Sequence, residues 1–258
     1  MATTAYSITQ SGRFEPFELQ VARNQISWHT PVNIFGYQED VTTSLNAVWD
    51  VSAVYVYPTA AIQMRVYSSS NSDVEVPITV VGLDANFVSI SENLTLTNGT
   101  TGVLTTKLFY RINALVVSNG IDPVGTITLS TSDKTVTYAR INLDTVGGVL
   151  RSAGRSQMSI YSVPAGHTFY LYRVDAYSSQ GGSGNAYANY RVQSENNVTG
   201  QRFEVLRAPF SNNYNARRSI PFPYTEKTDI QWQASVQTGT GPIGVIVEGI
   251  LIKNDAST

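Results

Sequence analysis

The sequence contains no cysteine, and this absence excludes disulfides, thiolate metal sites and cysteine nucleophiles. Histidine occurs only twice, as His29 and His167, in separate segments with no carboxylate at ligand spacing. We therefore expect no metal centre. No G-x-S-x-G nucleophile elbow is present, and no Lys-Ser or Lys-Thr follows the Gly-rich stretch at 181–184. The sequence predicts no enzymatic centre and no cofactor.

Charge is also scarce. Charged residues make up 14% of the chain, against about 25% in an average soluble protein. The 17 Lys and Arg and 19 Asp and Glu give a net charge of −2, which lacks the basic surface that nucleic-acid binding needs. The N-terminus has no charged segment followed by an apolar one, and no run of about 18 apolar residues occurs. We expect no signal peptide, no transmembrane helix, and neither nucleic acid nor membrane as a partner.

The chain does contain a regular alternation of apolar and polar residues with a period of two. Residues 74–84 (VEVPITVVGLD) and 87–106 show it most clearly, and this pattern is typical of half-buried strands. Turn signals such as Asn98-Gly99 recur about every 8–12 residues, which favours a β-sandwich or barrel. Residues 16–26 fit either a helix or an extended strand, and the extended form is favoured. The sequence therefore predicts an all-β protein.

The alternation is interrupted once, at residues 144–157 (DTVGGVLRSAGRSQ), where three glycines indicate a linker. We therefore expect two consecutive antiparallel β-sandwich domains, over 36–145 and 158–258, with the linker at 146–157 and an extended N-terminal arm over 1–35. In the second domain, Pro164-Ala165-Gly166 predicts a tight turn. The strand that follows has no plainly polar face, so we expect both of its faces to be buried.

The segment before Pro31 is the first candidate interaction site. Its apolar residues alternate with polar ones, so that Phe17, Leu19 and Val21 share one face of an extended strand. Pro31 restricts the preceding residue to extended conformations. Such a segment can add to a sheet edge or lie against a neighbouring subunit. The sequence predicts an assembly arm whose interface residues are Phe14, Phe17, Leu19, Val21 and Ile26.

Tyrosines near loops form the second candidate site, and they are represented by Tyr187, Tyr190 and Tyr214. Tyrosine is enriched at protein interfaces, and sugar-binding grooves use it as well, so both interpretations remain open. Core packing accounts for at least half of the 15 tyrosines.

Glycoside hydrolysis needs a pair of carboxylates that flank the bond to be cleaved. Asp73 and Glu75 are interpreted as a solvated strand end, and Glu226 and Asp229 as charges of a loop. No catalytic pair is predicted from them.

Several segments resemble virion structural proteins of tailed bacteriophages. They are GRFEPFELQVARNQISWHTPVNIFGYQEDV (12–41), VWDVSAVYVYPTAA (48–61), VVGLDANFVSISENLTLTNGT (80–100), RINALVV (111–117) and MSIYSVPAGHTFYL (158–171). The resemblance implies an extended N-terminal segment, a first β-domain with a Tyr-Pro-Thr turn, and a jelly-roll-like second domain that opens with a Val-Pro-Ala-Gly turn. All of these motifs are structural.

The resemblance further implies a particle component located in the virion and made in the host cytoplasm. Capsid decoration (cement) is the leading role, with a head, neck or tail position also open. The implied partners are other copies of the chain, as a homotrimer, and the major capsid protein. An adhesin-like module that binds host surface glycans through Tyr-lined loops is the alternative function, and an enzyme is the third.

Overall fold

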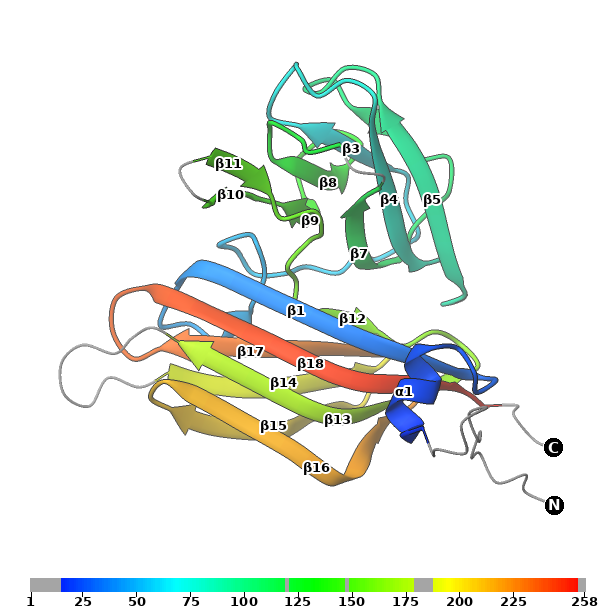
Figure 1. The fold of residues 1–258 in the computed structure, drawn as a ribbon, viewed down its shortest axis with the longest axis vertical. Coiled ribbons are helices and arrows are strands. Elements are labelled where there is room, and N and C mark those ends of the chain that lie inside the picture. The colour runs from blue at the N-terminus through cyan, green and yellow to red at the C-terminus, as the bar shows by residue number, and fades with distance from the viewer. Residues whose placement is uncertain (1–14, 119–120, 147–148, 179–187, 255–258) are drawn as a thin grey trace.

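The computed structural model describes residues 15–118, 121–146, 149–178 and 188–254, which form eighteen strands and one short helix. The strands build two units stacked on one another (Figure 1). The unit at the bottom of Figure 1 is the lower sandwich, and the one above it is the upper unit. Each unit consists of antiparallel sheets, which confirms the prediction of an all-β sandwich fold.

Two sheets form the lower sandwich. The first has the order β1 (His29–Val41), β18 (Gly241–Lys253), β13 (His167–Ser178) and β16 (Asn213–Tyr224). The second has the order β12 (Ile160–Ser162), β17 (Thr228–Val236), β14 (Ala188–Asn196) and β15 (Arg202–Phe210), and β2 (Asn46–Ala47) also pairs with β17. Their inner faces share one core, which buries Phe169, Tyr190 and Trp232 completely.

The upper unit has a second, separate core that includes Met64, Ile78 and Phe109. One sheet has the order β6 (Val103–Leu104), β3 (Met64–Ser68), β8 (Ile127–Thr131) and β9 (Thr137–Ile141). The other has the order β5 (Ser89–Leu96), β4 (Val76–Leu83) and β7 (Arg111–Val117). A hairpin of β10 (Leu143–Val146) and β11 (Val149–Ser152) completes the unit.

The upper unit is inserted into the lower sandwich, so the two units are nested in the chain. The chain leaves the lower sandwich at Trp49 and returns at Met158, and these two residues form a β-bridge. Beside the bridge, the Ser159 amide donates to the Val48 carbonyl at 2.8 Å. The predicted first domain, 36–145, is therefore wrong over residues 36–47, because β1 and β2 pair with strands that follow the insertion.

Two further expectations are corrected by the strand pairing. The predicted linker at 146–157 contains β11 and the last residue of β10, so these described residues form strands and do not form a linker. The turn at Asn98-Gly99 exists, since the Gly102 amide donates to the Asn98 carbonyl at 2.8 Å. It does not close a hairpin, however, because β5 pairs with β4 while β6 pairs with β3.

The expected extended arm is also corrected. Residues Phe17–Ala22 form a helix, α1, which buries Val21 and leaves Leu19 46% exposed. The strand β1 then pairs with β18 from His29 onward and places Ile34 and Val41 in the lower core. Residues 29–35 thus belong to a domain. The prediction of an extended form for residues 16–26 was wrong here, because the spacing of their apolar residues also fits the period of a helix.

The strand β13 is not buried on both faces as expected. A bulge between Leu171 and Arg173 shifts its register against both neighbouring strands. The bulge changes which alternate residues point inward, so Phe169 and Leu171 are buried before it and Val174 and Ala176 after it. The opposite face lies on the outside of the lower sandwich.

Candidate functional site

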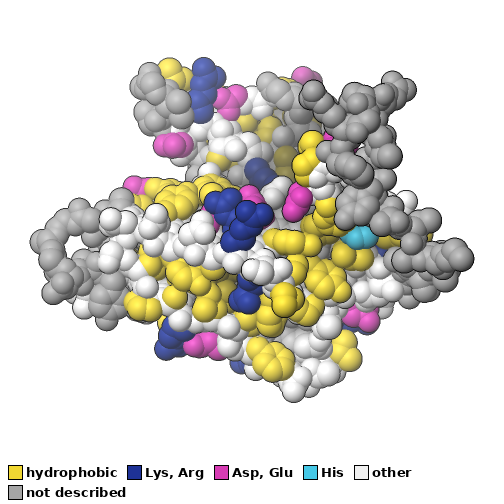
Figure 2. Space-filling view, turned by 60° about the horizontal axis from the view of Figure 1, so that its bottom comes forward, with side chains coloured by type: hydrophobic (Ala, Val, Ile, Leu, Met, Phe, Trp, Pro, Cys, Tyr) yellow, Lys and Arg dark blue, Asp and Glu magenta, His cyan; other side chains and the backbone are white. Residues whose placement is uncertain are grey.

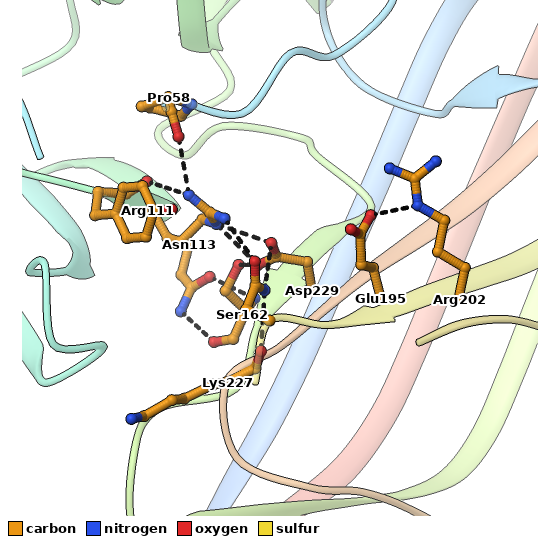
Figure 3. A network of polar contacts seen from close by, with 10 residues as sticks. Pro58, Arg111, Asn113, Ser162, Glu195, Arg202, Lys227 and Asp229 are labelled. Carbon is orange, nitrogen blue, oxygen red and sulfur yellow. Dashed lines mark hydrogen bonds and ion pairs between the residues drawn. The ribbon is translucent and has the colours of Figure 1, made fainter. Parts of the chain in front are cut away.

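A buried polar network joins the two units, and Figure 3 shows it from close by. Arg111 of β7 lies opposite Asp229 of β17, and their side chains are 4% and 6% exposed. The Arg111 Nε donates to Asp229 Oδ1 at 3.0 Å and to Oδ2 at 2.9 Å. The Ser162 hydroxyl donates to Oδ1, and Asn197 Nδ2 donates to Oδ2 at 2.8 Å. Both carboxylate oxygens are therefore satisfied.

The guanidinium of Arg111 is held on all sides. Its Nη1 donates to the carbonyls of Pro58 and Tyr110 at 3.1 Å and 2.9 Å, and its Nη2 donates to Asn197 Oδ1 at 3.2 Å. The rings of Tyr110 and Tyr57 lie 4.0 Å and 4.8 Å from its central carbon. Such cation–π contacts strengthen when they are removed from water.

This arrangement is a structural joint. Burial raises the pKa of Asp229, while the Arg111 guanidinium and the hydrogen bonds from Ser162 and Asn197 act in the opposite direction. The interpretation of Asp229 as one of the charges of a loop was wrong, because Asp229 lies in β17 and is buried. Asp73 is buried too, and it accepts hydrogen bonds from the amides of Val124 and Gly125.

An exposed edge of the lower sandwich is the strongest candidate for contact with another molecule. The strands β15 and β16 each end their sheets, and no described strand pairs with the outer side of either. On this β15–β16 edge, Phe203 is 51% exposed and Ile220 is 84% exposed. Figure 2 brings the bottom of the molecule forward and shows hydrophobic side chains gathered there between charged ones.

Prolines limit how this edge can be used. Pro209 lies on β15, and Pro221 and Pro223 lie on β16. A proline has no amide hydrogen to donate to an added strand, and natural proteins place it on edges to prevent strand pairing. The β15–β16 edge is therefore suited to side-chain packing against a partner rather than to strand addition.

The structure does not assemble the predicted arm residues into one surface. Within α1, Leu19 is exposed and Val21 is buried, and Ile26, which follows the helix, is half-buried. Phe17 is half-buried against His29, with ring centroids 5.8 Å apart. Phe14 lies outside the described residues.

The structure does not gather the predicted interface tyrosines on one surface either. Tyr190 is fully buried in the lower core, so its assignment to an accessible interface was wrong. Tyr214 is half-buried and stacks on Tyr190 at 5.4 Å between ring centroids. Tyr187 lies outside the described residues. The alternation of Ala188, Tyr190 and Val192 carried the signal for burial, whereas Phe203 and Ile220 were missed because their exposure depends on which strands end the sheets.

No group of three or more His, Asp or Glu side chains is arranged to hold a metal ion in the part of the chain that the structure describes. Within the same residues, the single helix is too short to cross a membrane.

No protein-family model matches the chain, and no curated protein matches its sequence. Among solved structures, T=1 particles derived from infectious bursal disease virus give 9% identity over 88% of this chain and 70% of that one, with a TM-score of 0.20. The VP2 subviral particle of the same virus gives 8% identity over 94% and 82% of the two chains, with a TM-score of 0.18. At these scores the similarity carries no argument about function.

Proposed function

We propose that the chain is a non-enzymatic structural component of a bacteriophage virion. Its role is that of a capsid decoration, or cement, protein, which stabilises the head through contacts with other copies of itself and with the major capsid protein. The observation that carries the proposal is the β15–β16 edge, where two sheets end side by side with Phe203 and Ile220 exposed. Apolar side chains on an unpaired edge are stabilised when a partner covers them.

The rest of the molecule supports this role. The lower sandwich and the upper unit are fixed to each other by the Arg111–Asp229 network and by the bridge between Trp49 and Met158. Two units joined by buried contacts can transmit load between neighbouring subunits without a cofactor. The low share of charged residues leaves a polar, weakly charged surface suited to repeated self-contact. The sequence segments that resemble phage virion proteins point in the same direction.

The copy number in purified particles tests the proposal. We expect quantitative mass spectrometry to find on the order of hundreds of copies in each virion, because a decoration protein covers a lattice that is repeated many times. About six to eighteen copies would instead assign the chain to the neck, tail or a fibre. A chain absent from particles would overturn the virion role itself.

Glycan binding through Tyr-lined loops remains the alternative. Tyr190 cannot contribute to a glycan site because its side chain lies in the core, and Tyr214 is only half-exposed. Binding of host polysaccharide to the purified protein, measured on a glycan array, would favour the adhesin over the decoration protein.

A further inference from the structure

An aromatic platform lies on the outer face of the lower sandwich. Tyr37 of β1, Gly244 of β18 and Tyr177 of β13 occupy one row across three adjacent strands. A Cβ atom at Gly244 would lie 2.1 Å from Cζ and 2.3 Å from the hydroxyl oxygen of Tyr177, so the tyrosine ring lies over the glycine. In the next row, Phe35 is paired with Ile246. Tyr177 is 39% exposed and Phe35 is 36% exposed, so both rings remain accessible.

This platform forms one side of a cavity of about 570 Å³ at the junction of the two units. The upper unit contributes Asn142 and Asp144 to the lining, and the returning chain contributes Gln157. Junctions between domains are common places for ligand sites. Since the walls come from both units, the shape of the cavity depends on the nested arrangement of the chain.

The charged side chains that line the cavity are all acidic, and Arg140, whose charge acts on Asp50, is not among the lining residues. Four carboxylates line it, from Glu39, Asp40, Asp50 and Asp144, and no Lys or Arg is among its described lining residues. Low-dielectric walls that carry one sign of charge concentrate ligands of the opposite sign. The Glu39 carboxylate also accepts a hydrogen bond from the Tyr37 hydroxyl at 2.6 Å, which joins the acidic wall to the aromatic platform.

Asp50 provides a second, independent indication of a cationic ligand. It is only 8% exposed, and its Oδ2 accepts a hydrogen bond from the Gln157 amide at 2.8 Å. Its Oδ1 is buried and accepts no hydrogen bond from the described residues. Burial favours the protonated form of such a carboxyl group, and a positive charge placed nearby favours its ionised form, so a bound cation would form an ion pair as Asp50 gives up its proton.

We propose that this junction cavity binds an organic cation, namely a primary ammonium or guanidinium group on an alkyl stem. The carboxylates attract the charge, the faces of Tyr37 and Tyr177 bind it by cation–π contact, and the stem packs on Phe35. The ligand is either a free polyamine or a Lys or Arg side chain of a neighbouring protein, since both present the same chemistry. The site does not depend on the virion role.

Calorimetric titration of the full chain at low salt tests the site with two ligands of nearly equal shape, 1,4-diaminobutane and 1,4-butanediol. We expect the diamine to bind and the diol not to bind. Tyr177→Ala should weaken the affinity for the diamine by roughly 3- to 30-fold, which is the range expected for the loss of a cation–π contact. The isosteric Asp40→Asn change should weaken it as well. The control is Glu195→Gln, which removes an exposed carboxylate of β14 outside this cavity and should leave binding unchanged.

Equal binding of the diol, or diamine binding that neither variant weakens, would overturn the proposal, and so would preferential binding of a neutral saccharide. Carboxyl-to-amine cross-linking of the native assembly then separates the two sources. A cross-link from Asp40 to a lysine of another chain identifies a protein ligand. Diamine binding without any such cross-link identifies a free amine.

Discussion

Arg111 of β7 and Asp229 of β17 form a buried ion pair across the two units, 118 positions apart in the chain. Replacing Arg111 by Met leaves the Asp229 carboxylate buried without its cationic partner. We expect this change to lower the free energy of unfolding by about 3–5 kcal/mol, as for other broken buried pairs. Urea denaturation followed by tryptophan fluorescence measures the loss.

The control for this prediction is the exposed pair between Glu195 and Arg202, which Figure 3 shows beside the network. Solvent screens that pair, so Arg202→Met should cost less than about 1 kcal/mol. If the Arg111 and Arg202 variants lost similar amounts of stability, the network would not be the joint between the units.

Asp50 makes stability depend on pH. Burial raises its pKa to about 8, against the opposing influence of the Gln157 amide and Arg140. In the unfolded chain the pKa of Asp50 is about 3.9. At a pH between these two pKa values, the native state therefore keeps a proton on Asp50 that the unfolded state has lost. Stability should therefore fall as pH rises from about 4 to about 8 and level off above it. Between about pH 6 and pH 9 the expected loss is on the order of 2–3 kcal/mol.

Thermal unfolding of the wild type and of Asp50→Asn across this range measures the effect. The amide cannot ionise, so the variant should lack this part of the pH dependence. An identical decline in the variant would assign the dependence to another group.

Ile220 on the β15–β16 edge is the residue whose change should separate assembly from folding. At 84% exposure, Ile220→Lys should leave the melting temperature unchanged while it weakens self-association or particle binding. Light scattering after size exclusion measures the oligomer. Val56→Lys, at 59% exposure in the upper unit, is the matched control. Normal assembly of the Ile220 variant would show that the interface lies elsewhere.

Truncation should distinguish α1 from β1. A chain that begins at residue 27 lacks α1 but retains β1, and we expect both units to fold. A chain that begins at residue 42 lacks β1, including the buried side chains of Ile34 and Val41. Each is worth about 1.5–3 kcal/mol when fully buried. The lower sandwich of the shorter chain should therefore unfold, which near-ultraviolet circular dichroism detects. A native spectrum of that chain would contradict the pairing of β1 with β18.

Local pattern was sufficient for the fold class but not for the connectivity. The alternation over 74–84 predicts β4 well, because the period of two depends only on neighbours in the sequence. Partner choice depends on the far end of the chain. No residue near β1 indicates that it pairs with β18, and a consecutive arrangement of domains was the simpler inference.

The sites show the same limit. The alternation around Tyr190 is sufficient to predict that its side chain is buried, since Ala188 and Val192 lie on the same face of the strand. Asp229, by contrast, has no local feature that marks it as the partner of Arg111, because the two meet only after both units have formed. Polar networks between distant segments are therefore found in the structure and not in the sequence.

The pairing of Val41 with Gly241 has a consequence for synthesis on the ribosome. About 200 residues must be translated after β1 before its partner strand exists, which takes roughly 10–40 s at about 5–20 residues per second. The upper unit, being continuous between Trp49 and Met158, can fold during that interval. The apolar side of β1 stays uncovered throughout, so a nascent chain that stalls late is a natural client for a chaperone.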